Sequence, residues 1–295
     1  MNNAILRRSA HHATILLTLG LLAPTLLSTQ ARAQADGRGG RSPGNPIGFT
    51  LDPGIGAGAL PARAEVFGVI TPAVTPAWVE ARALQLFGMV GSASDIGGGL
   101  LELRQDRAAF SVEVASGAWN WRNLDFTFTA GRISETDSLP TLDDAKIIAD
   151  LWLAAHGGMP PDSRFTRSVV NPGCVSVGYQ RVSSAANHPN WGAGARIIVD
   201  VGSNGAVVGA SVAWPEYYSI GTYSLITITS ALAAARSGNA IYLGRSDGVL
   251  TDPLVVYLAD PGAKTHVRPH VRFLVDGNPD HEVLVDLLPA DVVLP

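Results

Sequence analysis

Cysteine is nearly absent from this 295-residue chain, in which Cys174 stands alone. A single cysteine excludes an intramolecular disulfide, so the apolar core must hold the fold together. Cys174 follows a Pro172-Gly173 turn and opens the alternating stretch Val175–Tyr179, with no histidine nearby. This setting predicts a buried structural thiol at the start of a strand and argues against a cysteine nucleophile.

Charge is also scarce, since charged residues are 16% of the chain, against roughly 25% in an average soluble protein. Apolar residues make up 46%, which is enough for a sizeable core and excludes wholesale disorder. The formal net charge is −4. An acidic balance of this kind disfavours nucleic acids and anionic membrane surfaces as partners.

Long apolar runs are missing as well. The N-terminal run Ala13–Leu27 has fifteen residues, whereas a membrane-spanning helix needs about 20. Arg7 and Arg8 precede this run and Ala31-Arg32-Ala33 follows it. These features predict a cleaved signal peptide over residues 1–33, with an uncleaved interfacial helix as the alternative. We therefore expect an exported protein, periplasmic or secreted, with no membrane span after signal cleavage.

Motifs of common enzymes are absent or poorly placed. The chain contains no H-E-x-x-H, S-x-x-K or P-loop motif. A G-x-S-x-G motif occurs at Gly244–Gly248, and acids and histidines follow it in the order of a Ser-Asp-His triad. A nucleophile elbow needs a helix directly after the serine, but only Val249–Asp252 separates this motif from Pro253. The motif therefore predicts a turn at Ser246.

Three histidines form the candidate metal site. On an expected strand, His266 and His270 share one face but lie roughly 13 Å apart. One ion with bonds of about 2.1 Å bridges that gap only if Pro269 bends the chain. Alternatively, His281 meets His270 across a hairpin. The simpler interpretation is solvent-facing histidines on an edge strand, and no cofactor is expected.

The remainder of the chain shows a recurring order of elements. Residues 34–62 are rich in Gly and Pro and are expected to form a linker. Three units of a helix followed by strands then occupy residues 63–138, 139–222 and 223–295. Because the strands come in runs joined by short turns, the order predicts an α+β fold of repeated helix-plus-antiparallel-sheet units.

Capping residues and turns locate the elements. Thr75-Pro76 and Thr141 are expected to begin the first two helices, and the third is expected over Thr229–Ser237. Asn204-Gly205 between two apolar runs predicts a hairpin. Apolar spacing predicts the buried helix faces, which are Val79, Ala83, Leu86 and Phe87 in the first helix and Ile147, Ile148, Leu151, Trp152 and Ala155 in the second.

This order of elements resembles exported PepSY-type domains and the related accessory regulators of bacterial two-component sensor kinases. The resemblance spans about residues 64–290 and rests on three stretches, namely Thr141–His156 with Val175–Tyr179 and Asn204-Gly205, the short helix Thr229–Gly238 after Trp214-Pro215, and Leu254–Tyr257 with His266–Phe273. It implies a cystatin/PepSY-like architecture, in which a helix packs on a curved antiparallel sheet, and a non-catalytic binding, inhibitory or regulatory role. The regulators carry a membrane anchor, and the sequence predicts none after residue 33.

Aromatic residues outside the helical faces supply the candidate partner-binding site. Trp and Tyr are favoured anchors in protein interfaces, and four of them lie in or beside expected loops, namely Trp191, Trp214, Tyr217 and Tyr218. The alternative is that each plugs the end of a sheet. That alternative is preferred for Trp119 and Trp121, which share one face of a strand.

These observations favour a non-enzymatic binding or regulatory module that acts on a protein partner in the cell envelope or medium. An exported hydrolase with a metal-assisted site and a structural envelope protein are the alternatives. The first interpretation predicts that Trp214→Ala or Tyr217→Ala weakens partner binding and leaves the thermal midpoint nearly unchanged.

Overall fold

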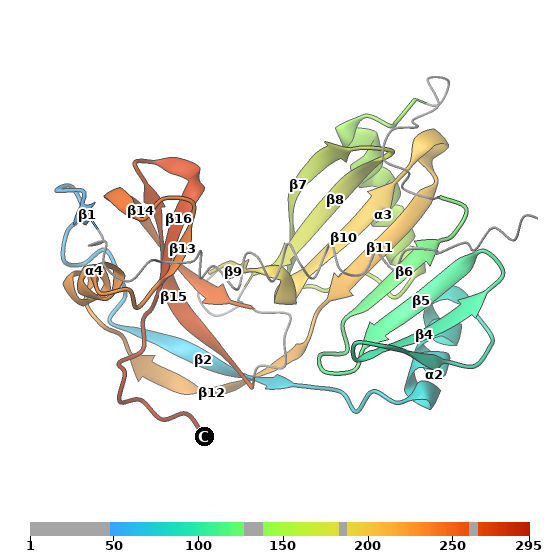
Figure 1. Ribbon diagram of the computed structural model, residues 1–295, viewed down its shortest axis with the longest axis horizontal. Helices are drawn as coiled ribbons and strands as arrows, with labels where there is room; N and C mark the ends of the chain where they lie inside the picture. Colours follow the sequence, from blue (N-terminus) through green and yellow to red (C-terminus); the bar gives the residue numbers. More distant parts are fainter. Residues whose placement is uncertain (1–47, 127–137, 183–187, 260–264) are drawn as a thin grey trace, which may run out of the picture.

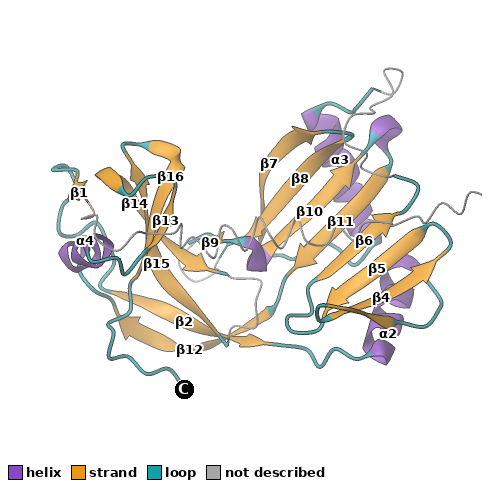
Figure 2. Cartoon of the chain, viewed as in Figure 1, coloured by secondary structure: helices purple, strands orange, loops and turns teal. Residues whose placement is uncertain are grey.

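A computed structural model describes residues 48–126, 138–182, 188–259 and 265–295. The expected α+β class is confirmed, because the chain forms two β-sheets with helices packed on them (Figures 1 and 2). The expected signal peptide and residues 34–47 of the expected linker lie outside the described residues. Within those residues, no helix is long and apolar enough to cross a membrane.

The first sheet is antiparallel throughout and has its two helices on one face (Figure 1). Its strand order is mirrored about the pair β6 and β11, and each half is preceded in the sequence by one of the helices. From one edge to the other the strands are β3 (Ser94–Gly97), β4 (Leu100–Gln105), β5 (Ala108–Glu113), β6 (Trp119–Asn123), β11 (Val207–Ala213), β10 (Arg196–Val201), β8 (Cys174–Arg181) and β7 (Ser163–Asn171), and the helices are α2 (Pro76–Phe87) and α3 (Leu142–Ala155).

Both helices begin where the capping residues predicted. The Thr75 side chain accepts a hydrogen bond from the backbone N–H of Trp78, and Pro76 occupies the first turn of α2. The Thr141 side chain accepts from the backbone N–H of Asp144 at the start of α3. Each cap satisfies a backbone donor that a helix start otherwise leaves free.

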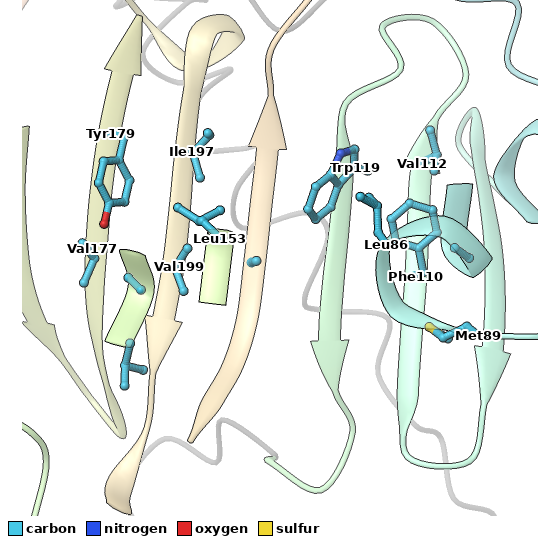
Figure 3. Close-up of a cluster of buried hydrophobic side chains, with 14 of the residues drawn as sticks. Leu86, Met89, Phe110, Val112, Trp119, Leu153, Val177, Tyr179, Ile197 and Val199 are labelled. Atoms are coloured by element: carbon cyan, nitrogen blue, oxygen red, sulfur yellow. The ribbon is translucent and has the colours of Figure 1, made fainter. Parts of the chain in front are cut away.

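The core of the first sheet lies between the strands and the helices (Figure 3). The prediction for α2 is confirmed at Val79, Ala83 and Leu86, which are all buried. The predicted face of α3 is confirmed at Ile148 and Trp152, which pack against the core, and is wrong at Ile147 and Leu151, which are 57% and 67% exposed. Instead, α3 packs on the sheet through Ala145, Ala149 and Leu153, and alanines let the helix approach the strands closely.

Tryptophans fill the space between the ends of the two helices. Trp119 and Trp121 point to the helix-covered face, where they pack against Phe87. Phe87 also packs against Trp152 and His156 of the other half, with ring centroids 5.9 and 5.3 Å apart. This aromatic cluster joins the two halves beneath one sheet.

The second sheet is covered by α4 (Ile228–Arg236). Residues 48–51, expected to be part of a linker, form a strand parallel to β14, and Phe49 is buried and stacks on Tyr242. A linker of small residues would not bury such a ring, so this stretch belongs to the core. The strands are β1 (Gly48–Leu51), β14 (Asp247–Leu258), β15 (His266–Val275), β16 (Asn278–Asp286), β13 (Ile241–Leu243), β2 (Arg63–Ile70), β12 (Glu216–Ser224) and β9 (Asn190–Trp191).

The chain passes between the two sheets four times. It leaves the second sheet after β2, returns for β9, leaves again for β10, and returns for β12. The last passage is short, because β11 ends at Ala213 and β12 begins at Glu216. Trp214 and Pro215 alone connect the sheets at this point.

Candidate functional site

An arginine fixes this short passage. Arg181, the last residue of β8, is 7% exposed. Its guanidinium carbon lies 4.8 Å from the ring centroid of Trp214 and 4.2 Å from that of Tyr217. Two aromatic faces at these distances provide cation–π attraction for the buried charge. We call Arg181, Asp162, Trp214 and Tyr217 the junction cluster.

Hydrogen bonds complete the junction cluster. Arg181 Nε donates to Asp162 Oδ2 at 2.7 Å, and its Nη1 donates to the backbone oxygen of Pro215 at 2.6 Å. Trp214 Nε1 donates to Asp162 Oδ1 at 3.2 Å. Burial raises the pKa of Tyr217, an effect that the positive charge of Arg181 opposes. The cluster is therefore an internal contact between the sheets in which Arg181, Asp162 and Trp214 are hydrogen-bonded, while the buried Tyr217 hydroxyl has no hydrogen-bond partner among the described residues.

Tyr218 lies on the opposite side of the same strand. On β12, Tyr217 faces inward and stacks on Phe67 of β2, with ring centroids 6.0 Å apart. Tyr218 faces outward over Gly68, where an added Cβ would come within 2.2 Å of the ring. Tyr218 is 51% exposed, and its diagonal neighbour Ile70 is 47% exposed. We call Tyr218 and Ile70 the ribbon patch.

Trp191 belongs to a separate cluster in the second sheet. Its Nε1 donates to Glu282 Oε2 at 3.0 Å, and Arg272 Nε donates to Glu282 Oε1 at 2.8 Å. The structure therefore brings together Trp214 and Tyr217 of the four predicted aromatic residues, and it places Tyr218 and Trp191 elsewhere. Arg181 and Asp162 carried no sequence signal, because they meet only through the pairing of β7 with β8.

The candidate metal ligands do not form a cluster. His266 contacts Thr265 Oγ1 and the Pro295 oxygen, while His270 contacts the Arg268 oxygen. His270 pairs with Asp286 across β15 and β16, so His281 lies farther along β16 and points to the other face. Contrary to the simpler interpretation, His270 is buried. Among the described residues, no group of three or more His, Cys, Asp or Glu side chains could hold a metal ion.

Two nucleophile candidates have the settings that the sequence predicted. Cys174 is buried, and burial, with the charge of Asp200 adding to it, raises the pKa of its thiol to about 11. At neutral pH the group is therefore a thiol, whereas the thiolate is the nucleophile. Ser246 precedes β14, so a strand follows the G-x-S-x-G serine where a nucleophile elbow requires a helix.

No family model matches this chain, and no curated protein matches it. Among solved structures, an uncharacterized protein from Eubacterium rectale aligns with 78% of this chain and 86% of its own, at 7% identity and a TM-score of 0.38. The Bacillus megaterium YpeB C-terminal domain aligns with 73% of this chain and 94% of its own, at 9% identity and a TM-score of 0.35. The resemblance to PepSY-type domains stays a prediction.

Proposed function

We propose that this chain is an exported, non-enzymatic binding module that acts on a protein partner in the cell envelope or medium. The observation that carries the proposal is the ribbon patch. Tyr218 and Ile70 expose a large aromatic and an apolar side chain side by side on β12 and β2. Exposed aromatic anchors of this kind supply much of the energy in protein interfaces.

The packing beneath the ribbon patch supports this role. The inward face of the β2–β12 ribbon is held by Phe67, which packs on Tyr217 and on Tyr257, the latter with ring centroids 5.2 Å apart. Tyr257 in turn donates a hydrogen bond from its hydroxyl to the Glu65 oxygen. Because the backbone beneath Tyr218 is fixed, little conformational entropy is lost when a partner covers the ring.

The helices and strands of this chain recur in a similar order. We infer that the chain is built from helix-plus-strand units of PepSY or cystatin type. The order α2, β3, β4, β5, β6 and the order α3, β7, β8, β10, β11, which meet in mirrored halves of one sheet, support this inference. α4 followed by β13 to β16 supports a third unit with a different strand order.

Comparison of three immobilised proteins tests the function. Envelope and secreted fractions of the source organism are passed over the wild-type chain, Tyr218→Ala and Leu84→Ala, and retained proteins are identified by mass spectrometry. Leu84 is the matched control, because it is a 56% exposed apolar residue on α2, away from the ribbon. We expect one protein to be retained by the wild type and by Leu84→Ala and lost from Tyr218→Ala, with at least a tenfold weaker Kd when the pair is purified. Equal retention on all three, or none, would contradict the assignment.

A further inference from the structure

Three arginines share the face of the first sheet that the helices leave open. Arg164 on β7 pairs with Gln180 on β8, which pairs in turn with Arg196 on β10. Arg167 pairs with Gly178, two residues from Gln180. Since directly opposed residues point to the same side of a sheet, Arg164, Arg167 and Arg196 form one group. The three strands lie side by side at one edge of the sheet (Figure 1).

A β-bulge creates this group. Arg164 and Arg167 are three residues apart, so in a regular strand they would point to opposite faces. The register shifts between Phe165 and Arg167, which leaves Thr166 as an extra residue and returns Arg167 to the face of Arg164. The Thr166 hydroxyl lies over Gly178, whose backbone oxygen accepts a hydrogen bond from it at 2.9 Å.

These arginines differ from the rest in having no partner within the described residues. Arg104, Arg107, Arg122, Arg181, Arg245, Arg268 and Arg272 pair with carboxylates. Arg63, Arg82 and Arg236 donate to a carbonyl or amide oxygen. Arg164, Arg167 and Arg196 make no such contact in the described part of the chain. Every other described arginine has a carboxylate or a neutral oxygen as its hydrogen-bond acceptor, whereas these three have none among the described residues.

The surroundings of Arg196 disfavour its positive charge. Arg196 is half-buried. Burial lowers the pKa of its guanidinium, and the positive charge of Arg167 lowers it further. Beside them, Gln180 donates to the backbone oxygen of Asn190, a buried residue whose side-chain Nδ2 also lacks a hydrogen-bond partner among the described residues. A buried donor without an acceptor, such as Asn190 Nδ2, destabilises a fold unless a water or a ligand satisfies it.

We propose that Arg164, Arg167 and Arg196 form a binding site for a ligand that carries two phosphate groups. Neighbouring strands are about 4.8 Å apart, so the outer two arginines approach a ligand from positions roughly 10 Å apart across the sheet. A planar carboxylate is satisfied by one or two guanidinium forks, whereas tetrahedral phosphate oxygens accept from several directions. Three positive charges also match the three to four negative charges of a diphosphate.

Calorimetric titration with inorganic pyrophosphate at low salt tests the site. We expect saturable binding to the wild-type chain that weakens as sodium chloride rises, because the attraction is electrostatic. Arg196→Gln should weaken the Kd at least about tenfold. Since Arg196 is half-buried and its replacement can disturb the fold, the exposed pair Arg164→Gln with Arg167→Gln is measured as well and should give the same loss.

The matched control is Arg82→Gln, which removes one positive charge from α2, on the other side of the sheet. It should bind pyrophosphate like the wild type. Absence of saturable binding, or an equal loss in Arg82→Gln and the double variant, would overturn the site. Tighter binding of citrate than of pyrophosphate would overturn its assignment to phosphate. The site is independent of the ribbon patch, so Tyr218→Ala should leave pyrophosphate binding unchanged.

Discussion

A buried positive charge needs negative charge, hydrogen-bond acceptors or aromatic faces next to it, because it has lost its water. Arg181 finds these in the carboxylate of Asp162, the Pro215 oxygen and two aromatic faces. Losing a partner of such a charge is costly, because the remaining group is left desolvated and unpaired. Trp214 therefore contributes both packing and a hydrogen bond to the stability of the fold, which revises the expectation that its replacement leaves the thermal midpoint unchanged.

Trp214→Ala should lower the free energy of unfolding by about 2 kcal/mol, because a half-buried ring and its contact with Arg181 are lost. Urea denaturation of wild type and variant measures the difference. Tyr218→Ala is the control and should cost below about 1 kcal/mol, since its ring is half exposed and lies over Gly68. A larger loss for Tyr218→Ala than for Trp214→Ala would refute this division of roles.

At the scale of elements, α3 shows that apolar spacing alone can assign the wrong residues to the buried face of a helix. Apolar spacing predicts a core face made of Ile147, Ile148, Leu151, Trp152 and Ala155, but among these only Ile148 and Trp152 pack against the core, and Ile147 and Leu151 are exposed. The structure instead buries the small residues Ala145 and Ala149. Close approach of a helix to a sheet favours small side chains at the contact, which hydrophobicity does not reveal.

Ala149→Leu should lower the free energy of unfolding by about 2 kcal/mol, because the larger side chain does not fit between α3 and the strands. Leu151→Ala should change it by less than about 0.5 kcal/mol, since Leu151 is exposed. Thermal unfolding followed by circular dichroism compares the two variants. The reverse order of effects would restore the face that apolar spacing predicted.

Local signals predicted much of the fold. Thr75 and Thr141 begin their helices, and positive φ angles at Asn204 and Gly205 place the hairpin between β10 and β11. These features depend on neighbours in the sequence. The junction cluster and the arginine group depend on strand register between segments far apart in sequence, so aromatic composition identified Trp214 and Tyr217 but not Arg181.

The whole molecule is held together by repeated passage of the chain between its sheets. Four crossings and the junction cluster connect the sheets. Loss of one sheet would therefore remove contacts that position the other. This arrangement favours one cooperative transition, in which both sheets unfold together.

Urea unfolding should give coincident curves by tryptophan fluorescence and by far-UV circular dichroism. Fluorescence reports mainly on the first sheet, where Trp119, Trp121 and Trp152 pack together, whereas circular dichroism averages over both sheets. Two steps in the dichroism curve, with fluorescence following only one of them, would show that the sheets unfold separately.

The path of the chain through β9 determines which parts of the fold a gene segment can encode separately. Asn190 and Trp191 leave the first sheet, add a short strand beside β14 in the second, and the chain then returns to form β10. Any contiguous gene segment that encodes the whole first sheet therefore also encodes a strand of the second. Recombination at a single pair of joints cannot exchange one sheet and leave the other complete, so the two sheets are expected to pass between lineages as one heritable block.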